Sequence, residues 1–349
     1  MMPMRCPTLS ELPPPPPGRT GWPWTEQTPP AGAPPPAGPW PRISIITPSL
    51  SCADLIEETI RSVLLQGYPD LEYIIIDGGS TDGTLDVIER YHAWLACAIS
   101  EPDKGQSDAI NKGLRRATGE VLAYVDTDGV YARGALQAVG AAFAVPAVKW
   151  FSGPGRLIGP NVGWGPTVGW GYTWPEKPWR ERWQWAAGNR LCQSPTFWRR
   201  EVTEAIGEFD TGLQVSMDQD YWLRMATAGC RLTWTRHTLS AFRTHEQSRT
   251  GRAGGDPTAE HILLWRRYAG QLTRQERRKA GRLMSVLDGR RLRWRAWRLA
   301  WQGKMRPAVK DCLAAVSAHP LLLLSPKTWA VLPLAVVRRL MRLVRRPKE

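Results

Sequence analysis

The stretch LEYIIIDGGSTDGT, residues 71–84, indicates the fold of this chain of 349 residues. Its first seven residues are mostly apolar and predict a buried strand. The GGSTDG that follows is rich in turn residues, and Asp82 within it is the expected N-cap of a helix over about residues 82–93. A strand, a turn and a helix in this order make up one unit of an alternating α/β fold.

The same alternation continues on both sides of this stretch. Further strands are predicted at 42–48, 95–100 and 121–128, and further helices at 53–66, 105–117 and 134–143. Such a chain forms a mostly parallel sheet flanked by helices, and its ligands bind beyond the carboxyl ends of the strands. Neither a GxGxxG sequence nor a Walker loop follows the first strand, which argues against an ordinary dinucleotide or P-loop site.

Composition divides the chain into three predicted segments. Residues 1–41 are dominated by proline and predict an extended, largely disordered leader. Residues 42–255 hold the α/β domain. Residues 256–349 predict a basic helical extension, because residues 266–349 carry 22 Lys or Arg against four acids and their net charge of +18 exceeds the +14 of the whole chain.

The basic extension has two interpretations. Trp294, Trp297 and Trp301 recur at helical spacing among arginines. Basic helices with an apolar, Trp-bearing face bind an anionic membrane surface, and this pattern favours a membrane over a nucleic acid as the partner. The alternative is a helical cap that packs on the α/β domain and leaves its basic face in solvent.

The sequence predicts a cytoplasmic protein that is peripheral on the inner face of the plasma membrane. The apolar stretch 319–337 is not expected to span a membrane, because Pro326, Lys327 and Pro333 interrupt it. The N-terminus lacks the layout of a signal peptide. The six cysteines are scattered without paired spacing, as reduced thiols would be, and predict neither a zinc site nor a disulfide framework.

Carboxylates at predicted strand ends are the candidate binding residues. Asp126 and Asp128 end the strand at 121–128, and neighbouring carboxylates repel unless a cation compensates them. Mg²⁺ or Mn²⁺ bridging a diphosphate would suit these oxygens, while an Asp-Gly turn is the alternative. Asp77 ends the strand at 71–77, where it can accept a hydrogen bond from a base or ribose, or else form the turn.

These motifs occur in an order that resembles glycosyltransferase family 2, whose members share the GT-A fold. The resemblance is carried by ISIITPS, ETIRSVLLQGYPDLEYIIIDGGSTDGT, SEPDKGQSDAINKG and ATGEVLAYVDTDGVYARGAL, and more weakly by QSPTFWRR, GEFD and MDQDYWLR. It covers about residues 42–250. Enzymes of this family move a sugar from a nucleotide diphosphate to an acceptor hydroxyl, usually with inversion at the anomeric carbon.

The resemblance implies an inverting, hexosyltransferase-type glycosyltransferase with Mn²⁺ or Mg²⁺ as its cofactor. Its partners would be a nucleotide-diphospho-sugar donor and a glycan or lipid-linked acceptor, in cell-surface polysaccharide or glycolipid synthesis. Residues expected at the donor nucleotide are Thr47, Pro48, Ser49, Asp77, Lys104, Asn111 and Asp126. A solvated side chain is the alternative for Lys104. Asp126 and Asp128 would form the Asp-x-Asp motif, with Asp128 as the closer metal ligand.

The resemblance also implies where the acceptor reacts. Asp218 in MDQDYWLR matches the family's general base, and Asp220 competes with it. Only one of them can be the base, because helix positions two apart point to different faces. His245 resembles a late motif residue at the diphosphate or metal, with a structural role as the alternative. Gln193 and Trp222 would lie on the acceptor side.

Three positions depart from the family pattern and keep other functions open. Gly78 and Gly129 stand where many members carry an Asp, and Met217 stands where Glu is frequent. Each departure removes a carboxylate. A non-catalytic nucleotide-sugar-binding protein with a degenerate site is therefore one alternative. A sugar nucleotidyltransferase is another, although the glycine- and arginine-rich loop of such enzymes is missing after ISIITPS.

Overall fold

The computed structural model describes residues 5–158, 181–187, 191–243, 258–301 and 305–318. The chain divides into two compact units, Met1–Trp185 with Asn189–Leu264, and Ala186–Gly188 with Trp265–Glu349. The first unit holds both β-sheets and all the predicted strands. The predicted division into residues 1–41, 42–255 and 256–349 stays a prediction.

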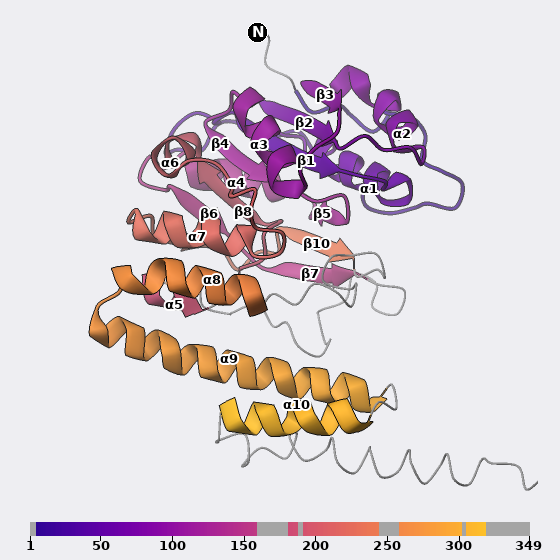
Figure 1. The fold of residues 1–349 in the computed structure, drawn as a ribbon. Helices are drawn as coiled ribbons and strands as arrows, with labels where there is room; N and C mark the ends of the chain where they lie inside the picture. Colours follow the sequence, from indigo (N-terminus) through magenta and orange to yellow (C-terminus); the bar gives the residue numbers. More distant parts are fainter. Residues whose placement is uncertain (1–4, 159–180, 188–190, 244–257, 302–304, 319–349) are drawn as a thin grey trace, which may run out of the picture. The chain divides into compact units, whose positions relative to one another are not determined.

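A seven-stranded sheet forms the centre of the first unit, in the order β3-β2-β1-β4-β8-β6-β9 (Figure 1). Its first four strands are parallel, and β8 runs antiparallel to both β4 and β6. The strands are β1 (Ile43–Ser49), β2 (Leu71–Asp77), β3 (Cys97–Ser100), β4 (Val121–Tyr124), β6 (Trp150–Ser152), β8 (Thr196–Arg199) and β9 (Leu232–Trp234). Every residue of β1 and β2 is buried, as expected for central strands of a parallel sheet.

Helices join these strands and pack on them through apolar faces. The helices of the first half are α1 (Ala53–Leu64), α2 (Thr84–Arg90), α3 (Gln106–Arg116) and α4 (Ala135–Phe143), with a short 3₁₀ turn at His92–Trp94. The apolar core joins Ile56 and Ile60 of α1 to Ile45 of β1 and Val139 of α4. Later come α5 (Arg182–Ala187), α6 (Arg200–Ile206), α7 (Met217–Thr227) and α8 (Thr258–Tyr268).

A second sheet of three strands lies beside the carboxyl end of β4. It has the order β5-β10-β7, with β5 at Gly129–Tyr131, β7 at Gly155–Ile158 and β10 at Ser240–Arg243. At its edge the Arg243 N–H donates to the Asp128 carbonyl oxygen over 2.9 Å. This sheet therefore fixes the backbone of the candidate Asp-x-Asp motif.

The proline-rich segment differs from the expected disorder, because residues 5–41 pack on the first unit. Arg61 of α1 is fully buried beneath them, and its guanidinium donates to the carbonyl oxygens of Pro13, Pro23 and Trp24 at 2.8–3.1 Å. The Trp24 ring lies 5.5 Å from the same guanidinium. Composition alone does not predict this packing, because it depends on the buried guanidinium of Arg61, which donates hydrogen bonds to backbone carbonyl groups of the segment.

Helices make up the described part of the second unit. They are the ends of α5 and α8, the 3₁₀ turn Ala269–Gln271, α9 (Arg274–Trp301) and α10 (Met305–Ala318). An exposed basic cluster covers the first turns of α9 and consists of Arg274, Arg277, Arg278, Lys279 and Arg282. Among the described helices, none is long and apolar enough to cross a membrane. The apolar stretch 319–337 lies outside the described residues.

The mostly parallel sheet with flanking helices confirms the predicted fold class. One local detail differs, since α2 begins at Thr84 and its N-cap is Gly83 in a left-handed conformation. Asp82 still serves the helix start, because its carboxylate accepts hydrogen bonds from the Thr84 N–H and from the Ala53 N–H at the start of α1, both at 3.2 Å. The turn thereby ties two helices together.

Candidate active site

Asp126 lies in the loop after β4 and is held by two glutamine side chains. Its Oδ2 accepts a hydrogen bond from Gln193 Nε2 at 2.8 Å, and its Oδ1 accepts one from Gln106 Nε2. Gln106 begins α3 and Gln193 precedes β8, so three distant segments meet at one carboxylate. The two amides therefore set the orientation of this carboxylate.

Helix α1 holds the loop that carries Asp126 and Asp128. The buried hydroxyl of Thr59 lies 2.8 Å from the Thr127 carbonyl oxygen and 2.7 Å from that of Gly129. Gly129 itself has no room for a side chain, because a Cβ there would lie 2.7 Å from Val125 Cγ2. Tight packing around Gly129 therefore leaves no room for the Asp that many family members carry at this position.

Asp77 holds the turn that follows β2, which was the alternative to a contact with the nucleotide. Its side chain is fully buried at the end of β2, and it accepts hydrogen bonds from the Gly79 and Ser80 N–H groups and from the hydroxyls of Ser80 and Ser100, at 2.5–3.0 Å. Four accepted bonds match the lone pairs that a carboxylate offers. The structure therefore gives Asp77 no contact surface for a nucleotide.

Gly78, the second departure, makes room for Asp103. A Cβ at Gly78 would lie 2.6 Å from Asp103 Oδ2 and 3.4 Å from Leu50 Cδ1. Asp103 also accepts the Gly105 N–H at 2.7 Å, which closes the turn before α3. The Asp103 carboxylate therefore lies next to Gly78, the position at which many family members carry an Asp.

The expected donor residues of β1 and α3 differ in exposure. Thr47 is fully buried and its hydroxyl pairs with Tyr73 at 3.0 Å, whereas the buried Ser49 hydroxyl has no hydrogen-bond partner among the described residues. Pro48 between them is buried and Lys104 is exposed. Asn111 is buried and exchanges two 2.9 Å hydrogen bonds with the Phe209 backbone, so it positions a loop.

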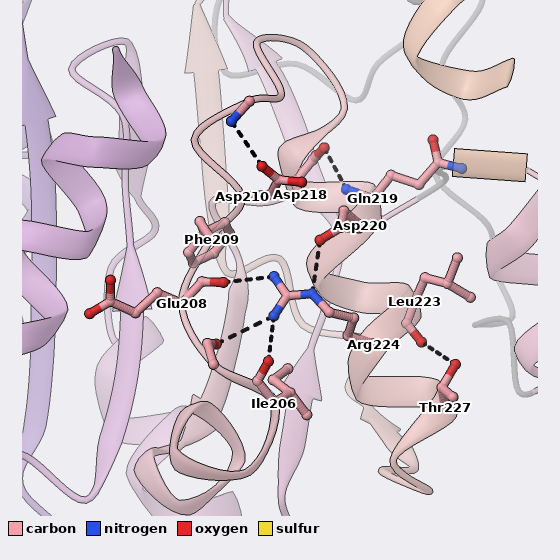
Figure 2. A network of polar contacts seen from close by, with 12 residues as sticks. Ile206, Glu208, Phe209, Asp210, Asp218, Gln219, Asp220, Leu223, Arg224 and Thr227 are labelled. Carbon is pink, nitrogen blue, oxygen red and sulfur yellow. Dashed lines mark hydrogen bonds and ion pairs between the residues drawn. The ribbon is translucent and has the colours of Figure 1, made fainter. Parts of the chain in front are cut away.

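Asp218 and Asp220 have different surroundings on α7 (Figure 2). Asp220 is 1% exposed and forms an ion pair with Arg224 over 2.8 Å. The Arg224 guanidinium in turn donates to the carbonyl oxygens of Ile206 and Glu208 at 2.7 and 2.8 Å. Asp218, at the second position of α7, is half-buried, and its Oδ1 accepts the Gln219 N–H at 2.7 Å. Asp220 is therefore committed to the fold.

Three of the predicted carboxylates act on one thiol. Burial, together with the charges of Asp218, Asp128 and Asp126, raises the pKa of Cys192 to about 12. An electrostatic effect of this kind falls off with distance, so the three carboxylates lie around a common neighbour. The structure thereby brings together the Asp-x-Asp motif and the residue expected to be the base, which are about 90 positions apart in the sequence.

Other predicted residues have different places. Trp222 is fully buried and stacks on Trp150 with ring centroids 5.9 Å apart, so it belongs to the core rather than to the acceptor side. Gln193 contacts Asp126, on the side of the Asp-x-Asp motif. Met217 faces α3, where its sulfur lies 2.8 Å from the Ser107 hydroxyl. His245 lies outside the described residues.

The residues at the Asp-x-Asp loop fit a hard divalent cation. Mg²⁺ and Mn²⁺ prefer oxygen ligands, and sites of this kind use one or two carboxylates together with substrate phosphates. Asp126 and Asp128 supply carboxylate oxygens in this loop, and Gln193 Oε1 is a buried oxygen with no partner among the described residues. Within those residues no group of three or more His, Cys, Asp or Glu side chains is placed to hold a metal ion.

Sequence reasoning missed the residues that support these carboxylates. Gln106 and Thr59 contact the Asp-x-Asp loop, yet each looks like an ordinary helix residue in the sequence. The only available signal for Gln106 was its place at the start of a helix that follows a parallel strand, since such helix starts lie at the ligand-binding edge. Thr59 gave no signal, because its role depends on how α1 packs.

A family model and several relatives match this chain. Residues 44–207 match the model described as "Glycosyl transferase family 2". The putative teichuronic acid biosynthesis glycosyltransferase TuaG of Bacillus subtilis is 39% identical over 100 residues, which are 28% of this chain and 40% of the relative. A PGL/p-HBAD biosynthesis glycosyltransferase of Mycobacterium bovis is 27% identical over 205 residues, 58% of this chain and 76% of the relative. The chain thus matches less than half the length of TuaG.

Two solved structures share the fold. Staphylococcus aureus TarS 1–349, in complex with UDP-GlcNAc, has a TM-score of 0.55 at 18% identity and covers 79% of this chain and 81% of its own. The mannosyltransferase PcManGT of Pyrobaculum calidifontis, in complex with GDP-Man and Mn²⁺, has a TM-score of 0.53 at 21% identity and covers 88% and 89%. Residues 44–207 thus match glycosyltransferase family 2, and the order of the motifs and the shared fold agree with this match.

Proposed function

We propose that the protein is an inverting glycosyltransferase of the hexosyltransferase type, which moves a sugar from a nucleotide-diphospho-sugar to an acceptor hydroxyl. One observation carries the proposal: Asp126, Asp128 and Asp218 all lie near enough to Cys192 for their charges to raise the pKa of its thiol. The first two suit a donor diphosphate with its cation, and the third suits an acceptor that attacks the same sugar.

The donor nucleotide would lie beyond the carboxyl end of β1. Ser49 offers a buried hydroxyl without a partner among the described residues, and Thr47 and Pro48 precede it on the strand. Lys104, exposed before α3, would reach the diphosphate, where its charge offsets that of the phosphates. Asp77 would shape the turn that borders the nucleotide rather than touch it.

A divalent cation would be held by Asp126 and Asp128, and Gln106 and Gln193 orient the Asp126 carboxylate. When bound, such an ion neutralises the charge that develops on the departing diphosphate. The two glutamines hold the Asp126 carboxylate in one orientation, so this chain presents it without further rearrangement. The Mn²⁺ in the related mannosyltransferase structure supports this choice of cation.

Asp218 would act as the general base. Its carboxylate accepts the proton of the acceptor hydroxyl while that oxygen forms a bond to the anomeric carbon. The bond from the anomeric carbon to the diphosphate oxygen breaks at the same time, and its electron pair leaves with the nucleoside diphosphate. Attack opposite the leaving group inverts the anomeric carbon. The ion pair of Asp220 with Arg224 inside the fold supports Asp218 over Asp220 as the base.

The acceptor would belong to a surface polysaccharide or glycolipid. This class follows from the names of the relatives, one for teichuronic acid and one for PGL/p-HBAD biosynthesis. An acceptor anchored at a membrane would suit the basic cluster of α9, which would bring the enzyme to an anionic cytoplasmic leaflet. The enzyme would then be cytoplasmic and peripheral to that membrane.

A panel of UDP- and GDP-sugars with Mn²⁺ tests the proposed function. We expect release of UDP or GDP from at least one donor, and we expect EDTA to stop it. A chain that binds donors, as shown by a raised melting temperature, but turns none of them over would contradict the proposal. That result would favour a nucleotide-sugar-binding protein, which the absence of side chains at Gly78 and Gly129 also allows.

A further inference from the structure

Glu260, in the first turn of α8, contacts the segment that leads into α7. Its carboxylate accepts three successive backbone N–H groups, from Gln214 at 2.8 Å, Val215 at 2.9 Å and Ser216 at 2.7 Å. Ser216 is the N-cap of α7 and makes no capping hydrogen bond with its side chain. A side chain 44 residues further along the sequence thus supplies the acceptor that the start of this helix needs.

The carboxylate of Glu260 is charged at neutral pH. Burial alone would raise the pKa of Glu260, but the three backbone N–H donors hold it below its ordinary value. A negative charge at a helix N-terminus also interacts favourably with the helix dipole. The contact is therefore stronger than a single neutral hydrogen bond.

The same segment is held on its other side by α3. Asn111 bonds twice to the Phe209 backbone, and the Ser107 hydroxyl contacts Met217. Residues 209–217 are therefore clamped between α3 and Glu260, and Asp218 follows directly. Gln106 at the start of α3 also donates a hydrogen bond to Asp126. The same helix therefore contacts both Asp126 and the segment that leads to Asp218.

We propose that Glu260 is a positioning residue for catalysis, which sets where Asp218 meets the acceptor hydroxyl by clamping the backbone of residues 214–216. This inference rests on the proposed function, in which Asp218 is the base. Small displacements of a catalytic group lower the chemical rate strongly, whereas donor binding depends on other residues. Glu260 should thus affect kcat and leave the KM for the donor unchanged.

The test uses the full chain and three variants. Glu260→Ala removes all three accepted bonds, and Glu260→Gln keeps one oxygen acceptor but loses the charge. Glu276→Ala is the matched control, because Glu276 also accepts a backbone N–H near a helix start, from Thr273 at 2.8 Å before α9. Amide hydrogen exchange at residues 214–216 reports the clamp without any need for activity.

We expect Glu260→Ala to speed amide exchange at residues 214–216 by about fivefold or more, the effect of a lost cap. It should lower kcat by about tenfold or more and change the donor KM by less than about twofold. Glu260→Gln should fall between Glu260→Ala and wild type in both measurements. Glu276→Ala should match wild type in both, and in an Asp218→Asn background Glu260→Ala should cause no further loss.

Three results would overturn the proposal. Unchanged exchange at residues 214–216 would show that Glu260 does not hold them. Faster exchange with an unchanged kcat would leave Glu260 as a helix cap alone, and a further tenfold loss in the Asp218→Asn background would show that it acts independently of the base. A wild-type chain without donor turnover would instead contradict the proposed function, and the exchange measurement would still decide whether Glu260 holds the segment.

Discussion

Carboxylates at the site differ in the partners that the fold gives them. Asp77 is saturated by four hydrogen bonds, and Asp220 is paired with Arg224. Asp126 is oriented by two neutral amides, and Asp218 lies at the start of α7 beside the same thiol as Asp126. The sequence shows all four as equivalent acids, so their separate roles follow only from these contacts.

Asp220→Ala should destabilise the protein, because it leaves the Arg224 guanidinium without the carboxylate that neutralises it. Breaking a buried ion pair in this way costs about 3 kcal/mol. Asp218→Asn, in contrast, should change the free energy of unfolding by less than about 0.5 kcal/mol. Guanidinium chloride unfolding of both variants measures the difference, and equal losses would contradict the separate roles of the two residues.

Gly129→Asp should lower stability without strengthening cation binding. The added Cβ would lie 2.7 Å from Val125 Cγ2, and overpacking of this kind costs about 1–3 kcal/mol. Thermal unfolding with and without Mn²⁺ measures both effects, with Gly212→Ala as a control at an exposed loop position. A variant that is as stable as wild type and binds Mn²⁺ more tightly would show that the loop has room for a third acid.

Helix α1 supports the site with one face and the proline-rich segment with another. Thr59 contacts the Asp-x-Asp loop, and Glu58 forms an ion pair with Arg243 at the end of β10. Arg61 binds the carbonyl groups of residues 13, 23 and 24. Residues 5–41 therefore pack on the same helix that contacts the Asp-x-Asp loop.

Arg61→Leu should destabilise the first unit strongly. The replacement leaves three buried carbonyl oxygens and the Tyr91 hydroxyl without their donor, which costs about 3 kcal/mol or more. Arg115→Ala is the control, since its ion pair with Glu208 is half-exposed and contributes at most about 1 kcal/mol. Similar melting temperatures for Arg61→Leu and wild type would mean that residues 5–41 are not bound to α1 in solution.

Periodicity in the sequence predicts the elements of the parallel half well. The strand predicted at 71–77 and the helix predicted at 105–117 lie within a residue of β2 and α3. The antiparallel β8 and the three-stranded sheet were not predictable, because their short strands carry no alternation of their own and are defined by their neighbours. For the same reason the sequence pointed to Asp126, Asp128 and Asp218 but not to Gln106, Thr59 or Glu260.

The whole chain joins an α/β domain to a strongly basic C-terminal segment. In the described part of that segment, Arg274, Arg277, Arg278, Lys279 and Arg282 are all exposed within nine residues. Each basic residue near an anionic leaflet contributes about 1 kcal/mol of attraction, and salt screens this attraction. We therefore propose that this cluster holds the protein at an anionic membrane surface.

Replacing these five side chains by Gln in the full chain should abolish flotation with liposomes that contain anionic lipid. The wild-type chain should float at about 0.1 M salt and detach at about 1 M, because the Debye length shrinks from about 10 to about 3 Å. Liposomes of neutral lipid are the control. Equal flotation of both proteins would contradict a role of this cluster and would favour a solvated basic face.

The most direct measurement compares wild type with Asp218→Asn for release of nucleoside diphosphate from a UDP- or GDP-sugar in the presence of Mn²⁺ and an acceptor. We predict that the variant binds the donor as wild type does but transfers the sugar at least about 100-fold more slowly, because the proton of the acceptor hydroxyl has lost its base. Asp218→Asn with the turnover of wild type would contradict the account.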